Sequence, residues 1–132
     1  LLKTDFVKIC EAIIRGTLDS VQIEFEKKAT VCKYVVPEGY PDSPVKNVAV
    51  HVGNIPEGVR LYYGSVEEKN SQLLLCGSRG IAVTGIAENL QMAEKIAEEA
   101  AMNIHGSVFH RRDIGTASLI QKRISMMQNL RT

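Results

Sequence analysis

Two short apolar runs in the second half of the chain, residues 73–76 and 81–86, flank a Gly-Ser-Arg-Gly segment at residues 77–80. Short runs of aliphatic and β-branched residues bounded by glycine predict buried strands. The segment between them predicts a tight connection or a bulge, because Gly77 and Gly80 can take backbone angles that other residues avoid.

Alternating and β-branched patterns elsewhere predict further short strands, at residues 21–26, 29–36, 48–52, 60–66 and 108–109. Three prolines and a glycine fall within residues 37–44, so this segment is expected to be an ordered turn or loop. The charged residues 67–71 are expected to form a hairpin loop.

Three stretches carry apolar residues at helical spacing, at residues 4–15, at 89–104 and from residue 116 onward. Their apolar faces are expected at Phe6, Ile9, Cys10 and Ile13, at Leu90, Ala93, Ile96, Ala97, Ala100 and Ile104, and at Ile120, Ile124 and Met127. The expected start residues are Thr4 or Asp5, Asn89 and Thr116, and the expected stop residues are Gly16 and Gly106. Together these patterns predict an α+β fold of short, mostly antiparallel strands with flanking helices.

Composition narrows the class of protein. A chain of 132 residues is long enough for one domain, and 45% hydrophobic with 23% charged residues is typical of soluble globular proteins. A net charge of +1 argues against a general nucleic-acid surface, no apolar run approaches the roughly 18 residues of a membrane helix, and nothing resembles a signal peptide. Cys10, Cys32 and Cys76 form no C-x-x-C pair, which predicts small buried hydrophobes in a cytosolic protein. Because the chain starts at Leu1 without a methionine, we expect it to be part of a longer polypeptide.

Most candidate catalytic side chains lack the spacing that catalysis or metal binding needs. The three histidines are not at metal-ligand spacing with any carboxylate or thiolate. The glutamate pairs at 67–68 and 98–99 are expected to be solvated charges. No serine or cysteine lies in a nucleophile elbow, and there is no phosphate-binding loop of the G-x-x-x-x-G-K-[ST] type.

Two arginine-bearing turns remain as candidate chemistry, at residues 77–80 and 110–115. In the first, unpaired backbone N–H groups near Gly77 and Ser78, the serine hydroxyl and the Arg79 guanidinium would together make a compact anion site. The alternative is a β-turn with a solvated arginine.

In the second turn, Asp113 can pair with Arg112 or cap the helix that Thr116 begins. The alternative to a binding role is a structural arginine–aspartate pair that fixes the loop. Both turns adjoin strand-like segments. A shared cleft that holds a phosphate or a carboxylate would explain both.

Three motifs then occur in a fixed order, Gly-Tyr-Pro at 39–41, GSRGIAVTGIA at 77–87 and FHRRDIG at 109–115. With the helix after the second motif, they resemble the C-terminal part of the phosphoribosylamine–glycine ligases, or glycinamide ribonucleotide synthetases, in an archaeal-like form of this ATP-grasp family. The resemblance implies that residues 1–26 are the tail of the ATP-grasp catalytic region and residues 27–132 the C-terminal domain. It also implies a barrel-sandwich, rudimentary hybrid-like version of the α+β fold.

The resemblance implies an ADP-forming ligase of purine biosynthesis. In that family ATP phosphorylates the glycine carboxylate, and the amine of 5-phosphoribosylamine attacks the glycyl phosphate to give glycinamide ribonucleotide, ADP and phosphate. ATP and Mg²⁺ are implied for the complete enzyme, a cytoplasmic one that partners neither nucleic acid nor membrane. The ATP-binding lysine, the lid and the acidic metal ligands are not in this chain. We therefore expect it to lack cofactors, catalytic residues and metal ligands, and to show no ligase or ATPase activity apart from the remaining ATP-grasp part.

For substrate binding, the resemblance implies a part of the phosphoribosylamine site. Arg79 is expected to hold the phosphate, with Gly77 and Ser78 as backbone donors. Arg112 and Asp113 are expected to belong to the same site, first as a pair that fixes the loop and second as ligands. The alternatives are a non-catalytic packing or assembly module and a free-standing phosphometabolite-binding domain.

Overall fold

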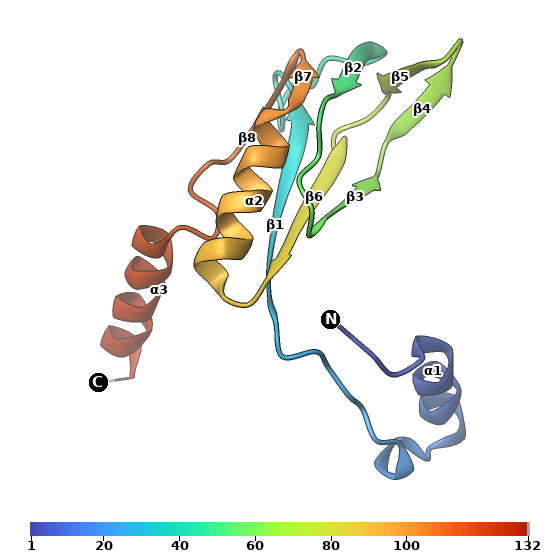
Figure 1. Cartoon of the computed structure of the whole chain (residues 1–132), viewed down its shortest axis with the longest axis vertical. Coiled ribbons are helices and arrows are strands. Elements are labelled where there is room, and N and C mark those ends of the chain that lie inside the picture. The colour runs from blue at the N-terminus through green and yellow to red at the C-terminus, as the bar shows by residue number, and fades with distance from the viewer. Residues whose placement is uncertain (132) are drawn as a thin grey trace.

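The computed structural model describes residues 1–131, which form three α-helices, one short 3-10 helix and eight strands (Figure 1). The helices are α1 (Phe6–Arg15), α2 (Leu90–Met102) and α3 (Ala117–Leu130), with the 3-10 helix η1 at Leu18–Ser20. The strands are β1 (Ala29–Pro37), β2 (Val48–Val52), β3 (Val59–Tyr63), β4 (Val66–Lys69), β5 (Gln72–Leu75), β6 (Ile81–Ala87), β7 (Ile104–Gly106) and β8 (Val108–His110). The expected α+β fold is confirmed.

The strands form two four-stranded antiparallel sheets, in the orders β3-β6-β1-β8 and β4-β5-β2-β7. Strands β5 and β6 therefore lie in different sheets, and the segment at 77–80 carries the chain from one sheet to the other. Strand β1 is central in its sheet, because it pairs with β6 over most of its length and with β8 only from Val35 to Pro37. Before Val35 its second edge lacks a strand partner within residues 1–131.

Helix α2 packs against β1 and β6 (Figure 1). Its buried residues are all alanines, namely Ala93, Ala97, Ala100 and Ala101. Small side chains let the helix approach the sheet closely, and a Cβ atom at Gly85 of β6 would overlap the carbonyl oxygen of Ala93. The main core cluster then joins both sheets and the helix, through Val35, Val50, Leu75, Ile81, Val83, Ala100, Ala101 and Ile104.

The helix starts follow the expected capping chemistry. The Asp5, Asn89 and Thr116 side chains accept hydrogen bonds from the backbone N–H groups of Val7, Met92 and Leu119, at 2.8, 2.9 and 3.4 Å. Gly16 ends α1 in the left-handed region, with φ of 68°. Helix α2 ends earlier than expected, at Met102 with Asn103 as its C-cap, so Ile104 and Gly106 lie in β7 instead.

One expected strand is absent. Residues 21–26 form no strand, because their only ladder contact in the described chain is an isolated bridge between Phe25 and Leu2. The alternating pattern there needs a neighbouring strand to become a sheet, and neither four-stranded sheet provides one.

A second strand prediction, residues 60–66, merges two elements. The chain leaves β3 at Tyr63 and enters β4 of the other sheet at Val66. The N–H groups of Gly64 and Ser65 each donate a 2.8 Å hydrogen bond to the 77–80 segment, which fixes this sheet change. Most of the expected loop at 67–71 belongs to β4, and only a turn with positive φ at Asn70 and Ser71 remains.

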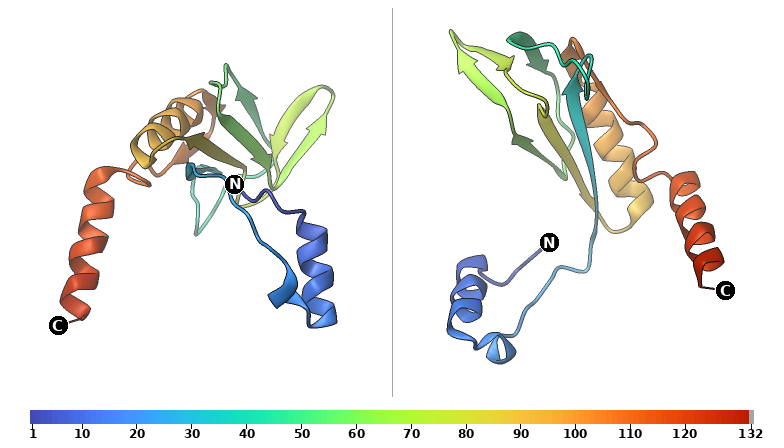
Figure 2. Two further views of the ribbon diagram at one scale, coloured as in Figure 1. Left: turned by 60° about the horizontal axis from the view of Figure 1, so that its bottom comes forward. Right: turned by 180° about the vertical axis from the view of Figure 1, so that it is seen from behind.

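Helices α1 and α3 stand apart from the two sheets (Figure 2). Helix α1 buries only Ile9 and Ala12. Helix α3 buries no residue, so the expectation that its apolar residues turn inward is wrong, and Ile124 and Met127 are each 44% exposed. No helix in residues 1–131 is long and apolar enough to span a bilayer.

Candidate functional site

A hollow of about 410 Å³ lies where β1, β8 and three connecting segments meet. It is lined by Cys32, Tyr34, Val36, Tyr40, Pro41, Arg79, Phe109, Arg111 and Ile114, and we call it the arginine pocket. Its volume is in the range of small-ligand sites. Its walls are apolar and aromatic apart from two guanidinium groups, which come from the two arginine-bearing turns.

The side chains of strand β1 alternate between two faces, one toward this pocket and one toward α2. Cys32 and Tyr34 are exposed and line the pocket, whereas Val31, Lys33 and Val35 are buried. The expectation that all three cysteines are buried is therefore wrong for Cys32, and the other two are half-buried.

The 77–80 segment brings Arg79 to the pocket. Gly77 and Gly80 do not have positive φ, so their role is close approach and not an unusual backbone angle. A Cβ atom at Gly80 would lie 2.7 Å from Leu75 Cδ2, and one at Gly77 would lie 2.6 Å from Ser65 Cβ. Within residues 1–131, no backbone carbonyl accepts from the N–H groups of Gly77 or Ser78.

The Arg79 side chain is exposed, and no hydrogen-bond or ion-pair partner for it lies in the described part of the chain. An unpaired guanidinium beside unpaired backbone N–H groups is a suitable place for an anion.

The second turn contributes Arg111, not Arg112. The Arg111 guanidinium makes a two-pronged contact with Asp113, from Nε to Oδ1 at 3.0 Å and from Nη2 to Oδ2 at 2.6 Å. The expected pair of Asp113 with Arg112 is therefore wrong. Residues 112–115 form a turn, and this turn brings the Asp113 carboxylate back to the Arg111 guanidinium. The hydrogen bonds from Arg111 are the main cause that lowers the pKa of Asp113.

Arg112 faces a different hollow, together with Val35 and Ala101. Its Nε lies 3.5 Å from Oε1 of Glu98. Asp113 also helps to start α3, because its carbonyl oxygen accepts from the N–H and the hydroxyl of Thr116. The structure thus joins Arg79 with Arg111 in one pocket and keeps Arg112 outside it.

Sequence reasoning missed a buried charge cluster behind this loop. Lys33 has a fully buried side chain, and its Nζ donates to Glu94 Oε1 at 2.7 Å, to Glu98 Oε2 at 2.6 Å and to the carbonyl of Arg112 at 3.0 Å. Glu98 Oε2 also lies 3.1 Å from His110 Nε2. The available signal was a single lysine within the apolar strand ATVCKYVV and two glutamates four residues apart on α2.

Glu98 is therefore not the solvated charge that its sequence context predicts, since its side chain is only 22% exposed. Burial acts to raise the pKa of Glu98, but hydrogen bonds from Lys33 and His110, with their charges, outweigh it and hold the pKa below the usual range of a glutamate. The carboxylate is thus ionised and holds three groups of the loop and strand together.

Residues 30–117 match the family described as phosphoribosylglycinamide synthetase, C domain. The chain belongs to this family. The chain is 53% identical over 131 residues to the phosphoribosylamine–glycine ligase of Methanosarcina acetivorans, and 50% identical over 134 residues to that of Methanocaldococcus jannaschii. The crystal structure of the phosphoribosylamine–glycine ligase from Thermotoga maritima matches with a TM-score of 0.66 and 28% identity, over 83% of this chain and 27% of that one.

The matches with the two archaeal ligases cover 99% of this chain and 30% of each relative. The resemblance that the three sequence motifs carry is confirmed, and the chain corresponds to the C-terminal part of these ligases.

ATP and Mg²⁺ are expected only for the complete enzyme, and the side chains of residues 1–131 do not form a metal site. Among residues 1–131, no group of three or more His, Cys, Asp and Glu side chains is arranged to hold a metal ion.

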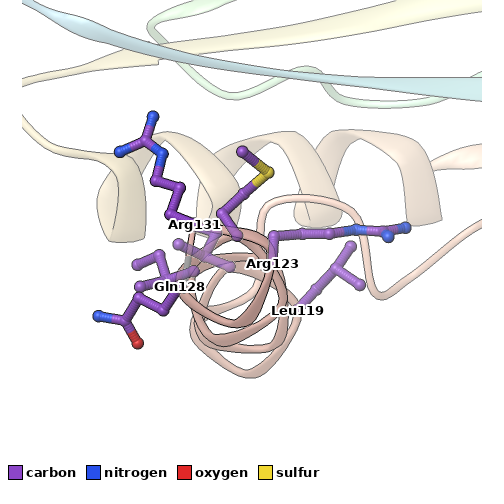
Figure 3. A pocket seen from close by; sticks show the side chains of 7 residues that line it. Leu119, Arg123, Gln128 and Arg131 are labelled. Carbon is purple, nitrogen blue, oxygen red and sulfur yellow. The ribbon is translucent and has the colours of Figure 1, made fainter.

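A larger hollow of about 540 Å³ lies along α3 and is lined only by residues of that helix and its C-cap, Arg131 (Figure 3). The labelled Leu119, Arg123, Gln128 and Arg131 all project from the one helix. A surface formed by a single helix encloses nothing, so the arginine pocket remains the better candidate site of the C domain.

Proposed function

We propose that this chain is the C-terminal part of a phosphoribosylamine–glycine ligase, which joins glycine to 5-phosphoribosylamine with conversion of ATP to ADP and phosphate. The product would be glycinamide ribonucleotide, an intermediate of purine synthesis. Membership of the C-domain family and 53% identity to a ligase of that name support this proposal. The enzyme would be cytoplasmic, with ATP and Mg²⁺ held by its remaining ATP-grasp part.

The single observation that carries a role for this chain is the unpaired Arg79 guanidinium in the arginine pocket. A ribose 5-phosphate carries close to two negative charges near neutral pH, and a planar guanidinium can meet two of its oxygens at once. In this proposal Arg79 binds the phosphate, and the N–H groups of Gly77 and Ser78 donate to its remaining oxygens. Asp113 serves the same site from the neighbouring loop by holding the Arg111 side chain, whereas Arg112 lies outside the pocket and supports the loop through Glu98.

A packing role is the second candidate function, and the exposed apolar residues of α1 favour it. Phe6, Val7 and Ile14 are 66, 62 and 84% exposed, more than an isolated soluble domain usually tolerates on one short helix. This surface suits contact with the remaining ATP-grasp part. The two functions are compatible, since one domain can pack against the ATP-grasp part through α1 and bind the substrate phosphate through Arg79.

The test is the substrate dependence of ADP formation by the complete protein. We expect Arg79→Ala to raise the KM for phosphoribosylamine roughly ten- to a hundredfold, because a charge-assisted contact of about 1.5–3 kcal/mol is lost. The KM values for ATP and glycine should stay nearly unchanged. Arg79→Lys should restore only part of the lost affinity, because an ammonium is a point charge and cannot bind two phosphate oxygens in the bidentate way of a guanidinium.

Arg60→Ala is the matched control, since Arg60 is an exposed arginine of β3 outside the arginine pocket. Equal damage to all three KM values in Arg79→Ala would contradict the phosphate role and favour a structural arginine. Absence of ADP formation with all three substrates would contradict the ligase assignment itself.

A further inference from the structure

The arginine pocket receives two guanidinium groups from separate loops. Arg79 comes from the sheet crossover at 77–80, and Arg111 comes from the loop between β8 and α3. One arginine is enough for a carboxylate, which carries a single charge. Two arginines facing one hollow match a phosphate monoester, which carries nearly two charges and three terminal oxygens.

Asp113 leaves Arg111 able to bind such a ligand. A guanidinium has five N–H donors, and the two contacts with Asp113 use one on Nε and one on Nη2. Three donors remain for an anion. The carboxylate also fixes the plane of the guanidinium, so less side-chain entropy is lost on binding.

The loop itself is held from the opposite face of β1. Strand β8 pairs with β1 only from Val35 to Pro37, and no other strand in residues 1–131 lies beside this edge of β1. The loop that carries Arg111 runs along the part of the edge that β8 leaves open. The Lys33 ammonium donates to the carbonyl of Arg112, which is the residue directly after Arg111. Further along, a Cβ atom at Gly115 would lie 2.7 Å from Val31 Cγ1, so the loop rests closely on the same strand.

We propose that Arg111 is a second phosphate-binding arginine of the arginine pocket, and that buried Lys33 is a positioning residue that holds its loop in place. The proposal rests on the proposed function and adds two residues to that site. The ligand class is a ribose 5-phosphate, with Arg79 and Arg111 on different oxygens of the phosphate. Lys33 itself does not touch the ligand, because its three donors are already bonded on the far side of β1.

The experiment measures the affinity of the complete protein for ribose 5-phosphate by calorimetry, together with the three KM values. Arg111→Ala should weaken ribose 5-phosphate binding and raise the KM for phosphoribosylamine about tenfold or more, with the KM for ATP and glycine unchanged. Arg112→Ala, the neighbouring arginine of the same loop, should cost much less. Arg60→Ala again controls for loss of a distant surface charge, and neutral ribose controls for the phosphate.

Lys33 is tested by its coupling to Arg111. Lys33→Met should weaken ribose 5-phosphate binding several-fold in the wild-type background, and should have almost no further effect when Arg111 is already alanine. A merely structural lysine would act equally in both backgrounds. If Lys33→Met fails to fold, the triple variant Lys33→Met/Glu94→Gln/Glu98→Gln removes the whole ionic group and leaves no unpaired buried charge, and the same coupling is expected.

Three outcomes would overturn the inference. An affinity unchanged in Arg111→Ala, a larger loss in Arg112→Ala than in Arg111→Ala, or additive effects of the Lys33 and Arg111 substitutions each contradict it. Failure of the proposed function has a different signature, namely no ADP formation by the wild-type protein. If Arg79→Ala impairs binding while Arg111→Ala does not, the proposed function stands and this inference fails.

Discussion

Lys33 is a charged side chain with no exposed surface, placed between valines in the central strand of a sheet. Removing an ammonium from water costs several kcal/mol, and this cost is offset only when every donor finds a partner. Here all three donors do, two of them on carboxylates. Such a cluster adds little net stability compared with a well-packed apolar core. What it provides is a fixed distance between β1, α2 and the loop that carries Arg111.

The pH dependence of stability gives a residue-scale prediction about Glu98. Because its pKa in the folded protein is lowered from the usual value, Glu98 stabilises the fold at pH values above the pKa of the unfolded chain. That stabilisation is lost as the pH falls through the lower folded value. We therefore expect the unfolding free energy of Glu98→Gln to depend less on pH below about 4.5 than that of the wild type, as measured by urea denaturation.

The neighbouring Glu99 provides the control, because it lies on the same helix but is exposed. In Glu99→Gln the unfolding free energy should depend on pH as it does in the wild type. Identical slopes in the wild type and Glu98→Gln would show that Glu98 does not hold the loop and strand through its charge.

At this scale the sequence predicted the type of chemistry but not the residue. An Arg-Arg-Asp turn indicates an ion pair, yet the pairing of Asp113 with Arg111 or Arg112 depends on the path of the loop. Likewise, the sequence predicts that Glu98 is solvated, because it does not show that Lys33 of β1 lies beside it. Local patterns do not contain such long-range contacts.

At the scale of elements, the close contact between β6 and α2 is set by small residues on both sides. Gly85 faces the helix, and the buried residues of the helix are all alanines. This spacing also sets the distance from α2 to β1, and so the reach of Glu94 and Glu98 to Lys33. The close packing of α2 therefore also determines the geometry of the Lys33 cluster.

Gly85→Ala tests this contact. The added methyl would overlap the Ala93 carbonyl and lie 2.9 Å from Ile96 Cγ1, so the helix must shift. We expect a loss of about 1–3 kcal/mol in unfolding free energy, measured by chemical denaturation. Gly16→Asn is the control, because nothing lies within 4 Å of that position and asparagine tolerates its left-handed backbone. A loss as large in the control as in Gly85→Ala would contradict the packing argument.

Helix starts were predictable because capping is local, and β1, β2, β6 and β8 were predictable because their apolar runs are bounded by turns. The sheet change at Gly64 and Ser65 was not, since a continuous strand and a broken one have the same composition. Residues 21–26 show the converse, because an alternating pattern without a neighbouring strand remains irregular. In both cases the presence or absence of a neighbouring strand determines whether the segment forms part of a sheet.

At the scale of the whole molecule, the structured core is residues 29–110, and the two outer helices contribute little to it. Helix α1 contacts mainly η1, and most of its apolar side chains are exposed. The chain around Leu1, Leu2 and Glu26 lines a hollow beside β3 and β6. The sequence-based boundary between residues 1–26 and 27–132 remains a prediction.

Deletion of residues 1–26 tests that boundary. Because α1 buries only Ile9 and Ala12, and neither belongs to the core clusters, the chain of residues 27–132 should unfold with nearly the same Tm as residues 1–132. We expect a difference below about 4 °C by calorimetry, since 1 kcal/mol shifts the Tm of a domain of this size by roughly that amount. Val35→Ala, at a position 1% exposed in the main core, should lower the unfolding free energy by roughly 2 kcal/mol and shows that the assay detects core damage. A fall in Tm after the deletion as large as that of Val35→Ala would mean that the first 26 residues fold as part of this domain. The apolar face of α1 would then stabilise the C domain itself, and the argument for its contact with the rest of the ligase would fail.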